Sequence, residues 1–261
     1  MKKAIIFLLL ISIFLITSCK KEKEIIDHNI YHYDISSSPI ATEELNEELN
    51  NAALKIAASS VGISVKHKNG LINNTGSGSG VIIKKENNDY YVLSCRHVIF
   101  NNTKTLCDEI KIYIDGNYYD SEVVYYHDQI DVAVIKFSSE LDYIPATINL
   151  NNDNIDGNII LTCSSPYDMT KYFNTITVGN ISNSKRIIEE ENLNGEMINN
   201  NYLQFTASIN TGSSGGGIFN IKGELIGIID WMLSNNKDNL KDMNFGIRIS
   251  EFSSNINQYL K

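Results

Sequence analysis

The sequence predicts an all-β protein with one short helix near its N-terminus. Short apolar runs rich in Val, Ile and Tyr alternate with turns rich in Gly and Asn, which is typical of antiparallel strands. The clearest of these runs lie at residues 61–65, 81–83, 90–99, 132–135 and 225–229. Apolar residues at helical spacing are found at residues 41–59, where they predict an amphipathic helix that packs on the body.

Composition limits the possible functions. The 261 residues are 43% hydrophobic, enough for one or two packed units with a sizeable core. The formal net charge is -9, and the body carries no cluster of Lys and Arg. Because affinity for phosphate depends on such clusters, we expect no nucleic-acid partner.

Residues 1–18 predict a leader peptide. Two lysines precede an apolar run at residues 4–16, which is too short to span a bilayer comfortably. The ending I-T-S-C at residues 16–19 resembles the lipobox of bacterial lipoproteins, which implies lipidation of Cys19 and a location in the bacterial cell envelope. An ordinary secretory signal and an uncleaved anchor are the alternatives; each places the body outside the cytoplasm.

A polar tether is expected at residues 19–40. It contains His28 and His32, whose spacing of four could place two imidazoles on one helical face to bind a metal. Neither the glutamate of the H-E-x-x-H pattern nor a third ligand is nearby. We therefore interpret the segment as solvated and expect no metal site.

A glycine-rich stretch, G-S-G-S-G, occupies residues 76–80. It lacks the Gly-Lys-Ser/Thr ending of a phosphate-binding loop, and it leads into a strand where such a loop would lead into a helix. We interpret it as the connection of a β-hairpin.

The segment with the strongest chemical signal is residues 207–220, A-S-I-N-T-G-S-S-G-G-G-I-F-N. It places Ser214 in a glycine-lined turn directly before a strand. A serine becomes a nucleophile when a base takes its proton and backbone N–H groups face the developing oxyanion, and glycines permit the close main-chain approach that this needs. A plain Gly/Ser hairpin loop is the alternative interpretation of this motif alone.

Two further residues complete a candidate catalytic set. His97 lies near the end of the run at 90–99, and Asp131 enters the run at 132–135; alone, each could be structural. All five histidines precede Ser214, which excludes the nucleophile elbow of α/β-hydrolases, where the histidine comes last. The subtilisin order would need the acid ahead of His97, and no Asp in that part of the chain lies in a comparable strand context. The order His97, Asp131, Ser214 is that of the chymotrypsin-like fold.

At these residues the chain resembles the trypsin-like serine peptidases, most closely those of the Deg/HtrA type. The similar blocks are residues 79–83, 93–98, 131–135, 175–179, 207–216, 223–228 and 245–248. The resemblance implies a peptidase domain at 41–255 built from two six-stranded antiparallel β-barrels, at about 60–143 and 144–250. Three features depart from the family: Cys95-Arg96 before the histidine, Ser164-Ser165-Pro166 where many members have Gly-Asn-Pro, and too little chain after residue 250 for a PDZ domain.

The same resemblance assigns roles to the candidate residues. Ser214 would be the nucleophile, His97 the general base and Asp131 the group that orients the imidazole, while the backbone N–H groups of Gly212 and Ser214 would form the oxyanion hole. Ser213 stands where activatable trypsins have an aspartate, so ordering of this loop by a freed N-terminus is not expected.

A specificity pocket is expected near Ser208, Ile228, Asp230 and Phe245. Ser208 offers no charge to a Lys or Arg side chain, which favours small or medium apolar side chains. Asp230 would reverse this preference if it pointed into the pocket.

With Cys19 lipidated, three cysteines remain, Cys95, Cys107 and Cys163. A disulfide between Cys95 and Cys107 would close a short loop beside His97 and stabilise the fold by roughly 3 kcal/mol. Alternatively each is a small buried apolar residue. We favour the second interpretation and leave the first open.

The expected function is a serine endopeptidase that hydrolyses unfolded or exposed protein segments, held at a bacterial membrane by its lipid. Its partners would be protein or peptide substrates and the membrane; no cofactor is expected, and oligomers are possible. The alternatives are a catalytically silent surface lipoprotein that uses the same barrels to bind proteins, and an esterase with the same site.

Overall fold

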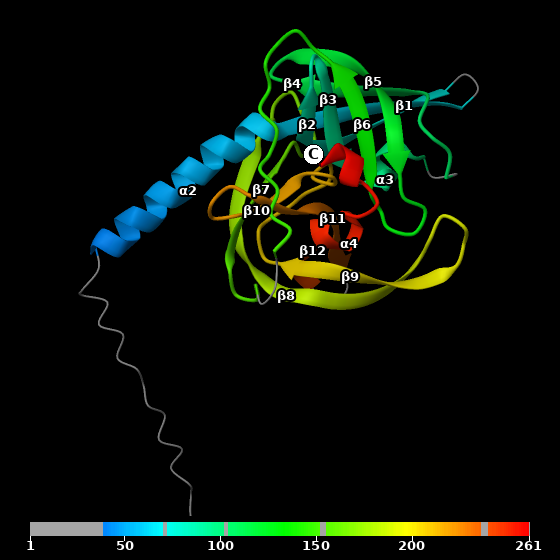
Figure 1. Cartoon of the computed structure of the whole chain (residues 1–261). Coiled ribbons are helices and arrows are strands. Elements are labelled where there is room, and N and C mark those ends of the chain that lie inside the picture. Colours follow the sequence, from blue (N-terminus) through cyan, green and yellow to red (C-terminus); the bar gives the residue numbers. More distant parts are fainter. Residues whose placement is uncertain (1–38, 70–71, 102–103, 152–154, 236–239, 261) are drawn as a thin grey trace, which may run out of the picture. The chain divides into compact units, whose positions relative to one another are not determined.

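Two closed barrels of six antiparallel strands each make up the body of the protein (Figure 1). The computed structural model describes residues 39–69, 72–101, 104–151, 155–235 and 240–260. The predicted leader, the tether with His28 and His32, and Cys19 lie outside these residues. Residues Ile40–Lys261 form one compact unit, which contains both barrels. Over the described part of the chain, no helix is both long and apolar enough to cross a membrane.

The first barrel has the strand order β1-β2-β3-β6-β5-β4 and closes through the pairing of β1 with β4. Its strands are β1 (Ser60–Asn69), β2 (Ile72–Glu86), β3 (Asp89–Ser94), β4 (Glu109–Ile114), β5 (Asn117–Tyr126) and β6 (Ala133–Ser138). Alternate apolar residues such as Val61, Ile63 and Val65 point into its core and are buried. The predicted barrel is therefore confirmed.

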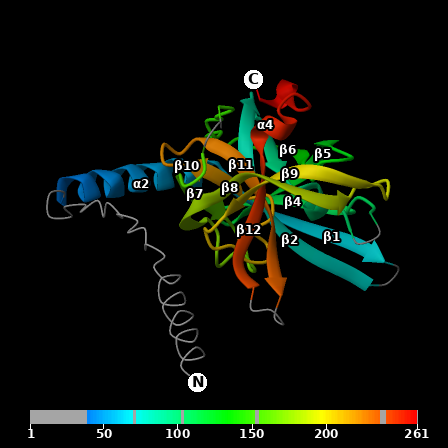
Figure 2. The same cartoon turned by 90° about the horizontal axis from the view of Figure 1, so that it is seen from below.

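The second barrel has the order β10-β11-β12-β9-β8-β7 and closes through β7 and β10. Its strands are β7 (Ile159–Ser164), β8 (Thr175–Glu191), β9 (Met197–Phe205), β10 (Gly217–Asn220), β11 (Leu225–Asn235) and β12 (Leu240–Arg248). Its core contains Leu203, Phe205, Ile218 and Ile229, all fully buried. In Figure 2 the strands of this barrel run in colour from yellow-green, for β7, to red, for β12.

Helix α2 (Pro39–Ser59) precedes the barrels and confirms the predicted N-terminal helix. Its apolar side packs on the body through Ala52 and Ile56, each only 1% exposed, whereas Leu54 faces solvent. The other helical segments are short: α3 (Arg96–Ile99), α4 (Ile249–Phe252) and the 3-10 turn η2 (Asn257–Tyr259).

The prediction of a hairpin connection at residues 76–80 was wrong. These residues lie inside the continuous strand β2 and pair with β1, with Gly78 opposite Ile63 and Gly80 opposite Val61. The glycines are required by packing: a Cβ on Gly78 would lie 2.4 Å from a methyl carbon of Val98. The G-S-G-S-G stretch therefore marks a part of β2 that other side chains, such as Val98, approach closely, and not the turn that the sequence predicted.

Candidate active site

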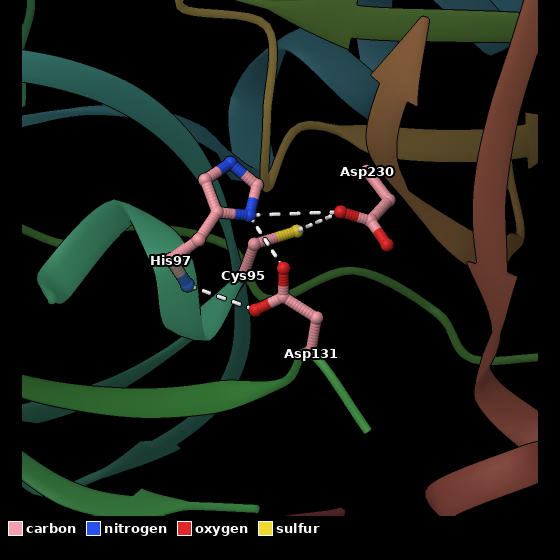
Figure 3. A group of neighbouring side chains, drawn as sticks. All are labelled: Cys95, His97, Asp131 and Asp230. Carbon is pink, nitrogen blue, oxygen red and sulfur yellow. Dashed lines mark hydrogen bonds and ion pairs between the residues drawn. The ribbon is translucent and has the colours of Figure 1, made fainter. Parts of the chain in front are cut away.

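His97 and Asp131 come together because the segments that carry them follow neighbouring strands. His97 lies in α3, just after β3, and Asp131 lies just before β6, which pairs with β3 so that Ser94 is opposite Ala133. One carboxylate oxygen of Asp131 is 2.5 Å from His97 Nδ1, and the other accepts the main-chain N–H of His97 at 2.8 Å (Figure 3). One oxygen thus holds the imidazole, and the other holds the main chain that carries it.

Arg96 holds the loop that carries Asp131. Its buried guanidinium donates from Nη1 to the carbonyl oxygens of His127, at 2.6 Å, and Ile130, at 3.0 Å, and its Nε lies 3.9 Å from Asp131 Oδ1. Sequence reasoning noted Arg96 only as a departure from the family. The signal that could have identified it is a permanent charge inside an apolar run, which requires buried acceptors.

Ser214 lies in the loop between β9 and β10, and this loop is fastened to the first barrel by Ser79. The main-chain N–H of Ser79 donates to the carbonyl of Ser214 at 2.8 Å, and the Ser79 hydroxyl donates to the carbonyl of Gly212 at 2.8 Å. The same hydroxyl accepts the N–H of Ser165 at 2.8 Å. Sequence reasoning missed Ser79, which is fully buried.

Gly215 makes this attachment possible. It has φ +84°, and a Cβ there would lie 2.2 Å from both the Ser79 carbonyl oxygen and Ser94 Oγ. The position therefore excludes any side chain, both by backbone conformation and by space. This is the physical reason for a glycine directly after Ser214.

Ser213 orders the same loop from inside. Its buried hydroxyl accepts the N–H of Asn210 at 3.1 Å and the hydroxyl of Ser164 at 3.0 Å, and its own N–H donates to the Asn210 carbonyl at 2.9 Å. These neutral hydrogen bonds stand where activatable trypsins use an ion pair, so the loop has a source of order within the chain.

Among the described contacts, the hydroxyl of the candidate nucleophile is bonded to a main-chain carbonyl and not to the imidazole. Ser214 Oγ donates to the main-chain carbonyl of Asp230 at 3.0 Å, and within the described part of the chain no hydrogen bond joins Ser214 to His97. Both side chains nevertheless line one cleft of about 810 Å³. His97 Nε2 points away from the carboxylates (Figure 3). A rotation of the serine side chain is therefore needed before Nε2 can take its proton.

The cleft also presents the expected oxyanion donors. Gly212, at φ +91°, and Ser214 both line it, and among the described residues no acceptor takes the N–H of either. Two N–H groups without a protein acceptor beside a serine hydroxyl can hold an anionic oxygen.

The expected specificity pocket needs correction. Of its four residues, only Asp230 lines the cleft. Ile228 is fully buried, and Phe245 is in the core with its ring stacked on Trp231 at 4.2 Å. Ser208 lies at the surface, where its carbonyl accepts the Thr177 hydroxyl. The mistake arose from assigning inward and outward faces by analogy, because one residue along a strand reverses the face.

Asp230 itself points toward His97 and away from any incoming side chain. Its Oδ1 is 3.6 Å from His97 Nδ1 and 4.0 Å from Cys95 Sγ, and the residue is 3% exposed (Figure 3). The condition under which Asp230 would create a preference for Lys or Arg is therefore not met.

The pKa values of His97, Asp131 and Asp230 are shifted in different directions by burial and by one another. Burial and the neighbouring Asp131 raise the pKa of Asp230 well above its usual value. Burial alone would raise the pKa of Asp131, but His97 and Arg96 outweigh it and lower that pKa. Burial would lower the pKa of His97, but Asp131 and then Asp230 raise it to about 9. Two adjacent carboxyl groups are thus divided into one charged and one neutral group.

The three described cysteines, Cys95, Cys107 and Cys163, are all free and buried. The open alternative of a Cys95–Cys107 disulfide is therefore not what the structure contains. Cys95 Sγ donates to the Ile229 carbonyl at 3.1 Å, and burial, followed by Asp230, raises the pKa of its thiol.

Comparison with known proteins identifies the family. A trypsin-like peptidase domain model matches residues 78–228. The chain is 31% identical over 188 residues to the serine protease Do-like HtrA of Lactococcus lactis, covering 70% of this chain and 45% of that protein. It is 32% identical over 176 residues to the serine endoprotease DegS of Haemophilus influenzae, covering 66% of this chain and 46% of that protein.

A solved structure has a similar fold. The serine endoprotease from Yersinia pestis superimposes with a TM-score of 0.62 at 26% identity, covering 81% of this chain and 66% of that one. The chain spans about half the length of the curated relatives it matches. On the family model, these relatives and the double barrel, the chain belongs to the trypsin-like peptidase family and is similar to its HtrA/Deg members.

Proposed function

We propose that the protein is a serine endopeptidase in which Ser214 is the nucleophile, His97 the general base and Asp131 the orienting carboxylate. The observation that carries the proposal is the double contact of Asp131 with His97 Nδ1 and main-chain N–H, with Ser214 on the wall of the same cleft. A carboxylate that holds Nδ1–H leaves Nε2 free to accept a proton, which is the requirement for a serine base.

The reaction begins when the Ser214 hydroxyl leaves the Asp230 carbonyl and turns toward His97 Nε2. Nε2 takes the hydroxyl proton as Oγ attacks the substrate carbonyl, and the resulting oxyanion is held by the N–H groups of Gly212 and Ser214. The imidazolium, stabilised by Asp131, then gives its proton to the leaving amine. Water, deprotonated by the same nitrogen, releases the acyl group and restores the hydroxyl.

The cleft supports binding of an extended, partly apolar peptide. Its walls combine apolar side chains from both barrels, namely Val65, Val98, Phe100, Ile209, Trp231 and Met232. We therefore propose unfolded or exposed protein segments as substrates, with small or medium apolar side chains at the reacting residue. Anchoring through a lipid on Cys19 in a bacterial cell envelope remains part of the proposal and rests on the sequence at residues 16–19.

A fluorophosphonate probe tests the activity, because it reacts with a serine only when base and oxyanion hole are in place. We expect labelling of the wild type and of Ser208→Ala, a surface serine near the same loop, and none of Ser214→Ala or His97→Ala. Folded wild type that stays unlabelled would instead favour the silent binding module. That alternative has one observation behind it, the resting bond from Ser214 to the Asp230 carbonyl. Comparing the turnover of amide and ester substrates distinguishes a peptidase from the esterase alternative, because an esterase would hydrolyse only the ester.

A further inference from the structure

The side chains of Cys95 and Asp230 have no part in the proposed reaction, yet both lie against the residues that carry it. Cys95, His97, Asp131 and Asp230 each offer one ligand atom, and these four atoms lie within 4.8 Å of one another. We call these residues the Cys95 cluster (Figure 3). They come from three separate segments, so no local sequence motif joins them. Cys95 is fully buried and Asp230 nearly so.

Two separations between donor atoms are comparable to those around a tetrahedral zinc ion. With metal–ligand bonds of about 2.0–2.3 Å, the ligand atoms around a zinc ion are roughly 3.3–3.7 Å apart. His97 Nδ1 is 3.6 Å from Asp230 Oδ1, and Cys95 Sγ is 4.0 Å from the same oxygen. The 2.5 Å contact between His97 Nδ1 and Asp131 Oδ2 must widen, which follows when the proton between them leaves.

From this geometry we propose that the Cys95 cluster is a Zn²⁺ site that inhibits the enzyme. One thiolate, one imidazole nitrogen and two carboxylates form a donor set suited to zinc. Ca²⁺ and Mg²⁺ are disfavoured, because they require six or more ligands that are almost all oxygen. His97 and Asp230 both line the cleft, so the cluster borders it, and the fully buried Cys95 completes the set of donors.

Charge balance favours the exchange. Counted from a neutral imidazole, Zn²⁺ displaces one proton from the Cys95 thiol and one from the Asp230 carboxyl, while the Nδ1 proton of His97 is replaced by one on Nε2. Two protons leave and one divalent cation enters, so the cluster keeps its single negative charge. The Arg96 guanidinium, 3.9 Å from Asp131, faces that charge. Relative to the neutral imidazole, binding therefore adds no net charge to a buried region. From the imidazolium, which the raised pKa of His97 favours near neutral pH, one further proton must leave.

Inhibition follows from the tautomer and rests on the proposed function. With Nδ1 bound to the metal, the neutral imidazole carries its proton on Nε2, and Nε2 can no longer accept the Ser214 proton. Asp131 is occupied at the same time. Binding of the metal, in contrast, requires only the four side chains and is independent of any peptidase activity.

Binding is tested with Co²⁺, a spectroscopic substitute for zinc, added to chelator-treated protein. We expect one ion per chain and a thiolate-to-cobalt charge-transfer band that zinc displaces. Cys95→Ala should lose the band and bind zinc at least about 100-fold more weakly, because even outer partners of metal ligands are worth 10- to 100-fold. Cys163→Ala is the matched control, since Cys163 is also free and fully buried. Absence of the band in the wild type, or its persistence in folded Cys95→Ala, overturns the site.

Inhibition is tested by the ratio of fluorophosphonate labelling rates with and without zinc, measured for each variant against itself. The ratio should fall at least tenfold for wild type and Cys163→Ala and stay near one for Cys95→Ala, and Mg²⁺ should leave it unchanged for all. Equal inhibition of Cys95→Ala would show that zinc acts elsewhere and overturn the inhibitory role. A cobalt band without any labelling would uphold the metal site and reject the proposed function, so the two failures are distinguishable.

Discussion

Replacing Ser79 with alanine tests whether the first barrel holds the nucleophile loop in place. The Ser79 hydroxyl is fully buried and makes two 2.8 Å hydrogen bonds, to the Gly212 carbonyl and from the Ser165 N–H. Without it, both main-chain groups lose a partner, and a buried group left unsatisfied costs about 1–3 kcal/mol. We expect the free energy of unfolding to fall by about 2–6 kcal/mol. Since Gly212 supplies an oxyanion donor in our proposal, we also expect labelling to slow by about 10²- to 10³-fold, the usual cost of one such donor.

Urea unfolding and the rate of fluorophosphonate labelling measure the two effects on the same protein. Ser59→Ala is the control, because Ser59 is equally buried but its hydroxyl donates only to the Ile56 carbonyl, in α2. It should change the free energy of unfolding by no more than about 1.5 kcal/mol and leave labelling as it is. If Ser79→Ala labels at the wild-type rate while remaining as stable, the loop is held by something other than this hydroxyl and the reasoning fails.

Three further predictions follow from the same geometry. Gly215→Ala should abolish labelling while the protein still folds, because a Cβ there would meet the Ser79 carbonyl at 2.2 Å; a measurable rate would contradict this. Arg96→Met, which keeps the aliphatic stem, should lower the free energy of unfolding by about 3–6 kcal/mol in urea titrations, since two charged hydrogen bonds to the Asp131 loop are lost. Labelling in chelator should rise with pH toward about 9, because the base must be neutral and the pKa of His97 is raised to about 9. A plateau already reached at pH 7 would refute that pKa. The raised pKa of His97 also stabilises the folded state. This contribution is fully present below the unfolded pKa of about 6.5 and is lost as the pH rises through about 9.

The candidate site residues could be proposed from sequence because each of them carries its own local signal. Ser214 lies among glycines, His97 comes near the end of an apolar run, and Asp131 directly precedes another. Their order along the chain then excluded other hydrolase folds. The barrels followed from the resemblance, since alternation alone predicts strands but not which strands pair.

The supporting contacts could not be predicted, because they join segments that are distant in sequence. Residues 76–80 have the composition of a turn, and only the packing of Val98 against Gly78 shows why a strand needs glycine there. Ser79, 135 positions before Ser214, resembles any small polar residue until β2 brings it against the nucleophile loop. Local composition indicates which backbone conformations a segment can adopt. The residues that a side chain contacts are decided only when the barrels close.

Asp230 shows how far one residue can change a familiar site. Its main-chain carbonyl accepts the Ser214 hydroxyl, and its carboxyl lies beside His97 and Cys95. The residue thus contacts the proposed nucleophile through its backbone and the proposed base through its side chain, so in our proposal it can couple their states. Burial and Asp131 raise the pKa of the Asp230 carboxyl, and Asp230 in turn adds to the effect of Asp131 in raising the pKa of His97. In our proposals, a metal ion that takes the place of the Asp230 proton also occupies His97 Nδ1, so this one residue links the metal site to the proposed base.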